Sequence, residues 1–233
     1  MNEIAEHLQA VLHKMRKACA RAGREPAGVR LLAVSKGFGP AAVGAAAAAG
    51  QREFGENYAQ EGATKIAALA AAGRRDLVWH FIGPLQSNKT RLAAENFHWV
   101  QSVDRLRIAE RLSAQRPPSL PPLNVCVQVN ISGEASKSGC APDETATLCA
   151  ALARLPRLRL RGLMAIPAPA SGETVRPAFR ALRELYEDIR GRGLVPAAEF
   201  DTLSMGMSAD FEIAIEEGAT LVRIGSAIFG PRS

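Results

Sequence analysis

Strand-like and helix-like segments alternate along the whole chain, and this alternation limits its possible folds more than any other feature. Eight short runs rich in apolar and β-branched residues are separated by longer stretches with helical periodicity. The strand-like runs cover residues 29–35, 52–55, 77–83, 97–103, 123–131, 158–166, 199–206 and 220–230. The helical stretches between them cover residues 40–49, 57–72, 86–95, 104–115, 143–155, 175–192 and 208–217. Such alternation predicts parallel strands joined by right-handed crossovers.

Eight such units predict an α/β fold, a single-domain (β/α)8 TIM barrel that spans residues 29–230. Residues 1–25 are expected to add a helix before the barrel. Apolar residues recur there on one helical face, namely Ile4, Leu8, Val11, Leu12, Met15 and Cys19. A doubly wound sheet is the alternative, but the GxGxxG turn that often follows its first strand is absent. No linker or change of composition divides residues 1–233, so one domain is expected.

The composition argues against several classes of function. The formal net charge is +6, but arginines alternate with acidic residues along the predicted helices, as in residues 180–193. A solvated surface is therefore favoured, and no nucleic-acid partner is expected. No apolar run approaches the roughly 18 residues that span a bilayer, so no membrane partner is expected. Glu3 and Glu6 interrupt the N-terminal segment and argue against a secretory signal.

The spacing of the cysteines indicates neither a metal site nor a disulfide framework. Cys19, Cys126, Cys140 and Cys149 form no CxxC pair and have no histidines at ligand spacing. A cytoplasmic location, where thiols stay reduced, is therefore expected. Cys126 lies within the fifth predicted strand, which favours a place in the core.

The loops after the seventh and eighth strands indicate a phosphate site, since barrels commonly bind phosphate there. Residues 204–208 (SMGMS) supply hydroxyl groups and a glycine that allows the backbone to approach an anion. Gly225 and Ser226 stand where a final short helix is expected to begin, and the N–H groups of a helix start suit an anion. The spacing therefore predicts a phosphate site in these two loops.

The same two segments are also consistent with ordinary turns from strand to helix, with Ser208 as a helix N-cap. Asp210 and Glu212 follow in the expected first helical turn. Acidic side chains suit the start of a helix but would repel a phosphate. Any phosphate contact in the seventh loop is therefore expected at residues 204–206.

Lys36 ends the first strand-like run and is one of only six lysines among 29 basic residues. In a barrel of this class the working residues lie at the C-terminal ends of the strands. A lysine there can form an ion pair, bind an anion as a point charge, or form a Schiff base with a carbonyl group. Desolvation and a neighbouring cation such as Arg223 would favour the neutral amine that a Schiff base needs. The residue pattern alone leaves these three roles open.

Several long motifs resemble one known family. They are AVSKG, FGENYAQE, WHFIGPLQSNK, VNISGEASKSG, GLMAI and LSMGMSADFEIAIEEGATLVRIGSAIFG, in order from the first strand to the C-terminus. The chain is similar to the pyridoxal phosphate homeostasis proteins, which resemble the barrel domain of alanine racemase and belong to the fold type III group. The resemblance implies the same barrel that the alternation predicts, with pyridoxal 5′-phosphate (PLP) as its cofactor.

The resemblance also implies a role for individual residues. Lys36 would hold PLP covalently as an aldimine, and Arg223 would lie near the ring nitrogen or the phosphate. Lys137 would be a secondary PLP lysine during transfer. The other residues that the resemblance places at the cofactor are Asn57, His80, Met164, Ser204, Met205, Gly206, Gly225 and Ser226. It implies no metal and no established catalytic residue.

Some of these residues also have a simpler explanation. His80 lies in an apolar strand, where a hydrogen-bonded core histidine is favoured over a catalytic one. Asn57 is as consistent with a helix N-cap as with a ligand contact. Met205 and Met207 are expected to pack in the core, while Met164 can both pack and contact the cofactor. Without a substrate, Lys137 is expected to be solvated.

These features together predict a protein that binds PLP and serves its intracellular homeostasis and delivery, without established catalysis. Related racemases need a tyrosine from a second domain. Here the chain ends directly after the eighth unit, and neither Tyr58 nor Tyr186 is an obvious substitute. The expected partners are PLP and apo PLP-dependent enzymes, with the protein a monomer or weak dimer. A weak PLP-dependent amino-acid racemase is the alternative. A Schiff-base aldolase that uses Lys36 on a sugar phosphate is a third possibility.

Overall fold

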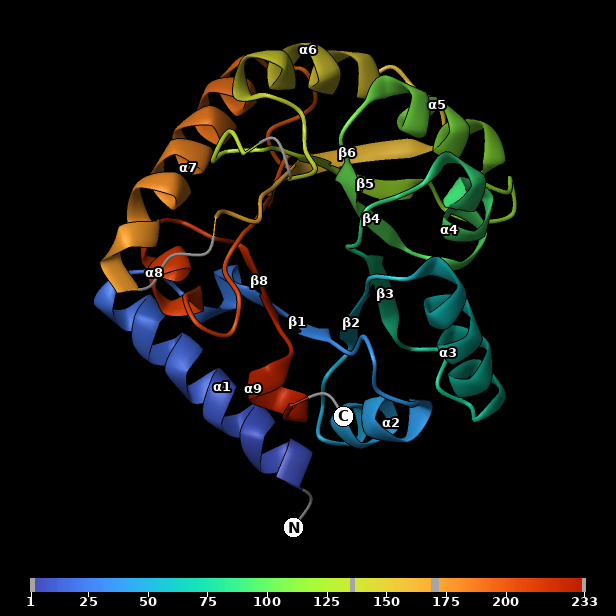
Figure 1. Cartoon of the computed structure of the whole chain (residues 1–233), viewed down its shortest axis with the longest axis vertical. Coiled ribbons are helices and arrows are strands. Elements are labelled where there is room, and N and C mark those ends of the chain that lie inside the picture. Colours follow the sequence, from blue (N-terminus) through green and yellow to red (C-terminus); the bar gives the residue numbers. More distant parts are fainter. Residues whose placement is uncertain (1–2, 135–136, 169–171, 232–233) are drawn as a thin grey trace.

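Eight parallel strands form a closed barrel in the computed structural model, which describes residues 3–134, 137–168 and 172–231 (Figure 1). The strands pair in chain order, and the eighth closes the barrel against the first, with Leu31 opposite Val222. The bounds are β1 (Arg30–Val34), β2 (Glu53–Glu56), β3 (Val78–Phe81), β4 (Trp99–Val103), β5 (Leu123–Gln128), β6 (Leu158–Met164), β7 (Thr202–Ser204) and β8 (Leu221–Ile224). The predicted (β/α)8 barrel is confirmed.

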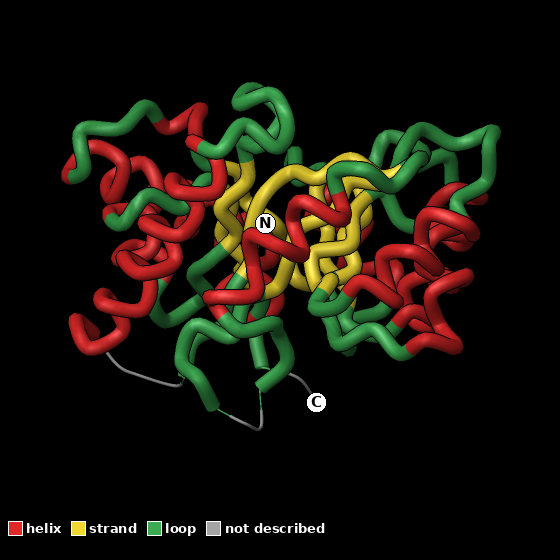
Figure 2. Tube along the Cα trace, turned by 90° about the horizontal axis from the view of Figure 1, so that it is seen from above, coloured by secondary structure: helices red, strands yellow, loops and turns green. Residues whose placement is uncertain are grey.

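Helices surround the barrel, and a view turned by 90° from Figure 1 shows the strands in the centre with helices on both sides (Figure 2). The α-helices are α1 (Glu3–Arg21), α2 (Pro40–Ala48), α3 (Ala59–Ala71), α4 (Thr90–Asn96), α5 (Leu106–Gln115), α6 (Pro142–Leu152), α7 (Arg176–Gly191), α8 (Phe211–Glu216) and α9 (Ser226–Phe229). Short 3-10 turns lie at Pro26–Gly28, Ser87–Lys89 and Gly172–Val175.

The last two strands are shorter than their sequence patterns predicted. The run 220–230 divides into β8 and α9, and the helix begins at Ser226 as expected. The run 199–206 contains only the three residues of β7. Gly206 adopts a φ of 91°, a left-handed conformation that turns the chain away from the sheet. Both shortened strands therefore deliver loop residues to the C-terminal face of the barrel.

Two residues considered as helix N-caps lie in loops instead. Asp210 occupies the N-cap position of α8, so Ser208 lies two residues before it. Tyr58 occupies the N-cap position of α3, so Asn57 precedes that helix as well. The simple capping explanation is therefore wrong for both Ser208 and Asn57.

The N-terminal helix α1 packs against the outside of the barrel, beside α8 and α9 (Figure 1). Arg21 pairs with Glu212 and Glu216 of α8, each at 2.9 Å. Near the other end of α1, His7 Nδ1 lies 3.2 Å from the Ile228 carbonyl oxygen. The first helix therefore fixes the last helix in place next to the barrel mouth.

The inside of the barrel contains both apolar and polar side chains. One apolar cluster consists of Leu32, Val34, Ile82 and Leu221, and another of Trp99, Cys126 and Met164. The core position expected for Cys126 is confirmed. Ser204 on β7 reaches Gln101 on β4 at 2.7 Å, so polar side chains also cross the interior. Both are fully buried.

Candidate cofactor-binding site

A cavity of about 270 Å³ lies at the C-terminal ends of the strands. Its lining comprises the apolar residues Val34, Ile82 and Ile166, the polar residues Lys36, Asn57 and Arg223, and the loop residues Met207, Ser208, Ala209, Gly225 and Ser226. Among the residues that the structure describes, no acidic side chain lines it. Ligand sites typically measure about 300 to 1,000 Å³, so this cavity suits one small molecule. Its two basic groups favour an anion.

Lys36 lies two residues after the end of β1 and is half-buried at the cavity. Of the lysines in the described part of the chain, it alone lines this cavity. The residues on both sides of it are anchored to glutamates. Ser35 Oγ donates to Glu56 Oε1 at 2.6 Å, and the Gly37 backbone N–H donates to Glu61 Oε1 at 2.8 Å. The backbone at Lys36 is therefore held from both directions.

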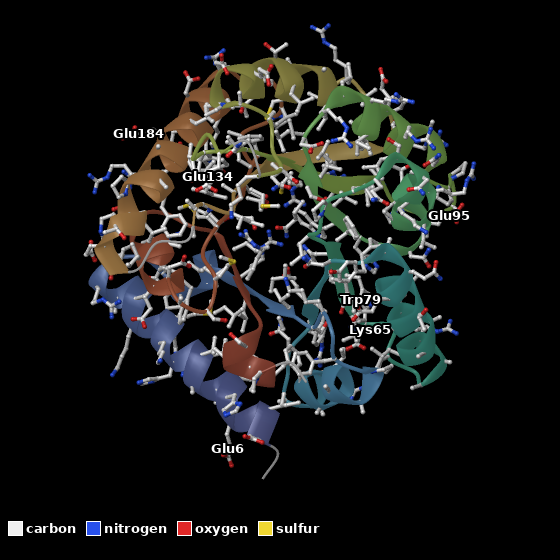
Figure 3. All side chains as sticks on the ribbon, viewed as in Figure 1. Glu6, Lys65, Trp79, Glu95, Glu134 and Glu184 are labelled. Carbon is white, nitrogen blue, oxygen red and sulfur yellow. The ribbon has the colours of Figure 1, made fainter. Side chains whose placement is uncertain are left out.

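Lys65 on α3 joins these two glutamates and is only 4% exposed. Its Nζ lies 2.8 Å from Glu56 Oε1 and 2.7 Å from Glu61 Oε1. It also donates to the Ser35 carbonyl oxygen at 2.7 Å. Figure 3 shows Lys65 on the side of α3 that faces the barrel. Three acceptors match the three hydrogens of the ammonium group, which stabilises the charge in a buried place.

Burial and hydrogen bonding shift the pKa values of Glu56 and Glu61 in opposite directions. Burial raises the pKa of Glu56, although Lys65 and Ser35 both donate hydrogen bonds to its carboxylate. Burial would also raise the pKa of Glu61. There, hydrogen bonds from Lys65 and the Gly37 backbone outweigh it and hold the pKa below the usual value. Glu61 is therefore ionised at neutral pH and balances the charge of Lys65.

Arg223 on β8 contributes a buried positive charge, with 3% of the residue exposed. Its Nη1 donates to Ser204 Oγ at 2.8 Å, and its Nη2 donates to the Ala165 carbonyl oxygen at 2.8 Å. Burial lowers the pKa of Arg223 to about 10, so the guanidinium stays charged at neutral pH. The cavity therefore has a cation whose orientation the barrel determines.

Asn57 lines the cavity and carries a buried acceptor. Its Oδ1 atom has no hydrogen-bond partner among the described residues. Its backbone carbonyl packs so closely against Gly83 that a Cβ atom at that glycine would collide with it. Leaving a buried acceptor unpaired costs roughly 1–3 kcal/mol, so a donor on a bound ligand would stabilise this site.

In the loop after β7, residues 207–209 line the cavity, whereas the sequence predicted contacts at residues 204–206. Ser204 and Met205 are fully buried and are not among the residues that line it. Met207 and Ser208 line it instead, and Met207 is 38% exposed rather than packed in the core. The phosphate contact expected at residues 204–206 therefore does not match the position of their side chains.

Gly206 makes this arrangement of the loop possible. A Cβ atom at Gly206 would lie 2.5 Å from Cβ of Ala214, in addition to the strain of its left-handed φ. Its carbonyl oxygen accepts the backbone N–H of Arg223 at 3.0 Å. Gly206 thus acts through the backbone, by turning the chain and tying the loop to β8.

Three other residues expected at the cofactor lie outside the cavity lining in the described part of the chain. His80 is fully buried and its ring stacks on Trp99 with 5.0 Å between centroids, as a core histidine would. Met164 is fully buried in the cluster with Trp99 and Cys126. Lys137 is half-buried in the loop after β5 and is thus not fully solvated.

Two classes of site find no support in the described ranges 3–134, 137–168 and 172–231. No group of three or more His, Cys, Asp or Glu side chains is arranged to hold a metal ion. No helix in these ranges combines the length and the apolar character needed to cross a bilayer.

Comparison with known proteins places the chain in a family. The family model described as "Alanine racemase, N-terminal domain" matches residues 7–233. The pyridoxal phosphate homeostasis protein of Pseudomonas aeruginosa is 59% identical over 233 residues, with 100% of this chain and 97% of the relative covered. The one from Escherichia coli K12 is 55% identical, with 100% and 98% covered. The chain belongs to the pyridoxal phosphate homeostasis proteins.

Solved structures agree with this assignment to the pyridoxal phosphate homeostasis proteins. PipY of Synechococcus elongatus, in a structure with PLP bound, has a TM-score of 0.80 and 35% identity, and 97% of this chain and 100% of PipY are covered. A protein of Bifidobacterium adolescentis has a TM-score of 0.90 and 37% identity, with 97% and 94% covered. Alanine racemase of Corynebacterium glutamicum, at 21% identity and a TM-score of 0.69 over 96% of this chain and 62% of its own, shows the fold alone.

Some residues of the site were not found by the sequence-based prediction. Lys65 and Glu61 are four residues apart, a spacing typical of a solvated ion pair on a helix surface. Glu56 ends the second strand, where functional residues are expected in a barrel of this class. Its position in the sequence could therefore have indicated a role in the site. Nothing in the local pattern indicates that Gln101 on β4 faces the interior.

Proposed function

We propose that this protein binds PLP through an imine between Lys36 Nζ and the cofactor aldehyde, and that it serves PLP homeostasis. The observation that carries the proposal is the placement of Lys36, half-buried at a cavity with a second, buried cation at Arg223. Imine formation joins a primary amine to an aldehyde and releases water, which lysine can do and arginine cannot. The names of the relatives and the PLP bound to PipY support the choice of cofactor.

The groups that line the cavity fit those of PLP. The positive charge of Arg223 and the hydroxyl groups of Ser208 and Ser226 suit an anionic phosphate. The unpaired Oδ1 of Asn57 suits a donor on the bound cofactor. We therefore place the phosphate contacts at Ser208, Gly225 and Ser226.

The charge of Arg223 favours holding the cofactor over using it. When bound, PLP supplies an aldehyde and a ring that can accept electrons, and the ring accepts them best when its nitrogen is protonated. An arginine is a donor that stays charged, so it cannot serve as a proton source and acceptor in turn. Arg223 can orient and balance the charge of a cofactor without promoting its chemistry.

The two tyrosines also favour binding without catalysis. Tyr58 is 68% exposed, and Tyr186 is buried with its hydroxyl donating to the Phe200 carbonyl oxygen at 2.6 Å. Neither lines the cavity within the described residues, so neither offers the second base that a racemase requires. Weak racemization of a small amino acid stays the second candidate, because solved racemases share the fold.

Delivery of PLP follows from the chemistry of an accessible imine. A primary amine on a recipient can replace Lys36 at the aldehyde carbon, with no net oxidation or reduction. We propose apo PLP-dependent enzymes in the cytoplasm as recipients, with the protein acting as a monomer or weak dimer. Lys137, in the loop after β5, is proposed as a secondary acceptor during transfer.

Spectroscopy of the loaded protein tests the binding proposal. After incubation with PLP and desalting, the protein is expected to keep the yellow absorbance of a protonated imine. Lys36→Arg is expected to lose it, whereas Lys89→Arg, at an exposed lysine outside the cavity, is expected to retain it. Full retention of the absorbance by Lys36→Arg would contradict the proposal.

Amino-acid turnover separates homeostasis from racemization. The loaded protein is incubated with L-alanine, L-serine and L-threonine, and the products are separated by chiral chromatography. We expect no inversion at the α-carbon, to D-alanine, D-serine or D-allo-threonine, above the level of Lys36→Arg. A sizeable kcat that depends on Lys36 would establish the racemase alternative.

A further inference from the structure

A chain of polar side chains runs from the buried Arg223 across the barrel interior to Glu53, which is half-buried. Arg223 Nη1 lies 2.8 Å from Ser204 Oγ, which lies 2.7 Å from Gln101 Oε1. Gln101 Nε2 lies 2.8 Å from His80 Nδ1, and His80 Nε2 lies 3.1 Å from Glu53 Oε2. The five residues come from five different strands. We call this set the interior relay.

The donor at one end of the interior relay and the acceptor at the other determine the direction in which its hydrogen bonds are donated. An arginine can only donate hydrogen bonds, and an ionised glutamate can only accept them. Because Arg223 donates to Ser204, the serine hydroxyl passes its own hydrogen to Gln101 Oε1. The amide nitrogen of Gln101 then donates to His80 Nδ1. A neutral His80 must therefore carry its hydrogen on Nε2, next to Glu53.

The opposite orientation of the Gln101 amide is disfavoured. It would place Oε1 at His80 Nδ1, and the single hydrogen of a neutral imidazole would have to be there. The unprotonated Nε2 would then face the carboxylate of Glu53, so that two acceptors would repel each other. Arg30 lies 3.5 Å from Glu53 and helps to keep that carboxylate ionised.

His80 is neutral in this setting. Burial lowers its pKa to about 4, although the nearby Glu53 acts in the opposite direction. The final contact is bent, because the Nε2–H bond does not point directly at the Glu53 oxygen. It therefore stabilises the tautomer electrostatically rather than as a linear hydrogen bond. The ring is also held by its stacking on Trp99.

We propose that Ser204, Gln101 and His80 are positioning residues that hold the Arg223 guanidinium in place at the cofactor cavity. The proposal rests on the proposed function only where it names PLP as the group that Arg223 faces. An apolar interior would be simpler to stabilise, since each buried polar atom needs a partner. Here hydrogen bonds connect His80, Gln101 and Ser204 to Arg223, which is one of the two basic side chains that line the cavity in the described part of the chain.

The tautomer of His80 provides the first test, and it needs no cofactor. The full-length 15N-labelled protein is studied by long-range 1H–15N correlation of the histidine rings, with and without PLP. His80 is assigned from the signals missing in His80→Gln. We expect hydrogen on Nε2 and an unprotonated Nδ1 at neutral pH in both states. Hydrogen on Nδ1, or on both nitrogens, would overturn the direction of the interior relay.

Interrupting the interior relay provides the second test. Gln101→Met preserves length but removes both hydrogen bonds of the amide. We expect broadened Arg223 guanidinium NMR signals, a shifted absorbance maximum of bound PLP and roughly ten-fold faster PLP release on dilution. Gln9→Met makes the same substitution on the exposed face of α1 and should behave as the unmodified protein.

Ser204→Ala removes one hydroxyl group of the interior relay and should change the same three measurements in the same direction as Gln101→Met. It replaces Gln101→Met in the test if that variant does not fold.

Two outcomes separate this proposal from the proposed function. If the unmodified protein retains no PLP and borohydride reduction attaches no pyridoxyl group to Lys36, the proposed function fails. The tautomer of His80 still decides the direction of the hydrogen bonds in the interior relay. If the protein binds PLP, but folded Gln101→Met and Ser204→Ala release it at the original rate and keep its absorbance, the positioning role is wrong.

Discussion

Two basic residues on neighbouring strands line one cavity. Lys36 follows β1, and Arg223 lies on β8, where it is opposite Leu32 of β1. The described part of the lining contains two basic residues and no acidic one, so the cavity favours an anionic ligand. Each basic residue is oriented from behind, Lys36 through its chain neighbours and Arg223 through Ser204. The two groups that would meet the cofactor are thus oriented by the fold.

The lowered pKa of His80 predicts how the free energy of unfolding depends on pH. Its pKa is lowered from 6.5 to about 4, so between these values the unfolded chain binds a proton that the folded chain does not. This contribution to stability is therefore complete above pH 6.5 and is lost as the pH falls towards 4, by about 3 kcal/mol in total. Urea denaturation at several pH values should show a shallower fall for His80→Gln than for the unmodified protein. Equal slopes would contradict the assignment of this pH dependence to His80.

At the scale of secondary-structure elements, α3 holds the backbone that follows β1 in place through hydrogen bonds. The ion cluster of Glu56, Glu61 and Lys65 connects β2 and α3 to the residues on either side of Lys36. A buried cluster like this one stabilises a structure little compared with apolar packing, but losing one member leaves an unpaired charge. Its effect is therefore to position the chain end rather than to add stability.

Lys65→Met tests this connection. Three acceptors would lose the hydrogen bond from Lys65, and we expect the free energy of unfolding to fall by about 3–5 kcal/mol. Lys17→Met, at an exposed lysine of α1, should change it by less than about 0.5 kcal/mol. Both are measured by urea denaturation. The double variant Lys65→Met with Glu56→Gln should recover part of the loss. A Lys65→Met protein as stable as the Lys17→Met control would show that the cluster does not hold this region.

Gly206→Ala tests the turn after β7. A Cβ atom would lie 2.5 Å from Cβ of Ala214 at a φ of 91°, so a loss of more than about 1 kcal/mol is expected. The matched control is Gly44→Ala in α2, where nothing lies within 4 Å of the new Cβ. That change should stabilise the protein by up to about 1 kcal/mol. Thermal unfolding measures both variants, and shifts of the same sign would refute the role of Gly206.

At the scale of the whole molecule, closure of the barrel brings the ends of the sequence together. β8 pairs with β1, and α1 packs against α8 and α9 (Figure 1). Ser226 at the start of α9 thereby lines the same cavity as Lys36, although the two residues are 190 positions apart in the sequence. The site depends on the completed barrel, because no single βα unit contains it.

The fold was predictable because it depends on local pattern. Alternating periodicity and a count of eight suffice for a closed parallel barrel, and the position of a residue at a strand end places it at the mouth. Lys36, Arg223, Gly225 and Ser226 all line the cavity for this reason.

The remaining part of the site depends on information that the pattern lacks. A strand buried on both faces reads as a continuous apolar run, so the sequence does not tell which residues face inwards. Ser204 was expected at the cofactor from its place at a strand end, and His80 from the family resemblance, although both lie in the barrel interior. Lys65 was overlooked because burial of a helix lysine depends on what packs against it. Tertiary contacts, rather than local propensity, decide these positions.

The central claim is that Lys36 is the covalent anchor of PLP, and borohydride trapping tests it most directly. Reduction of the loaded protein, followed by peptide mass spectrometry, should find close to one pyridoxyl group per chain, on the peptide that contains Lys36. Lys36→Arg should leave that peptide unmodified. A pyridoxyl group found only at Lys137, or at no lysine, would contradict the account. Trapping of a sugar phosphate at Lys36 in place of PLP would favour the aldolase alternative.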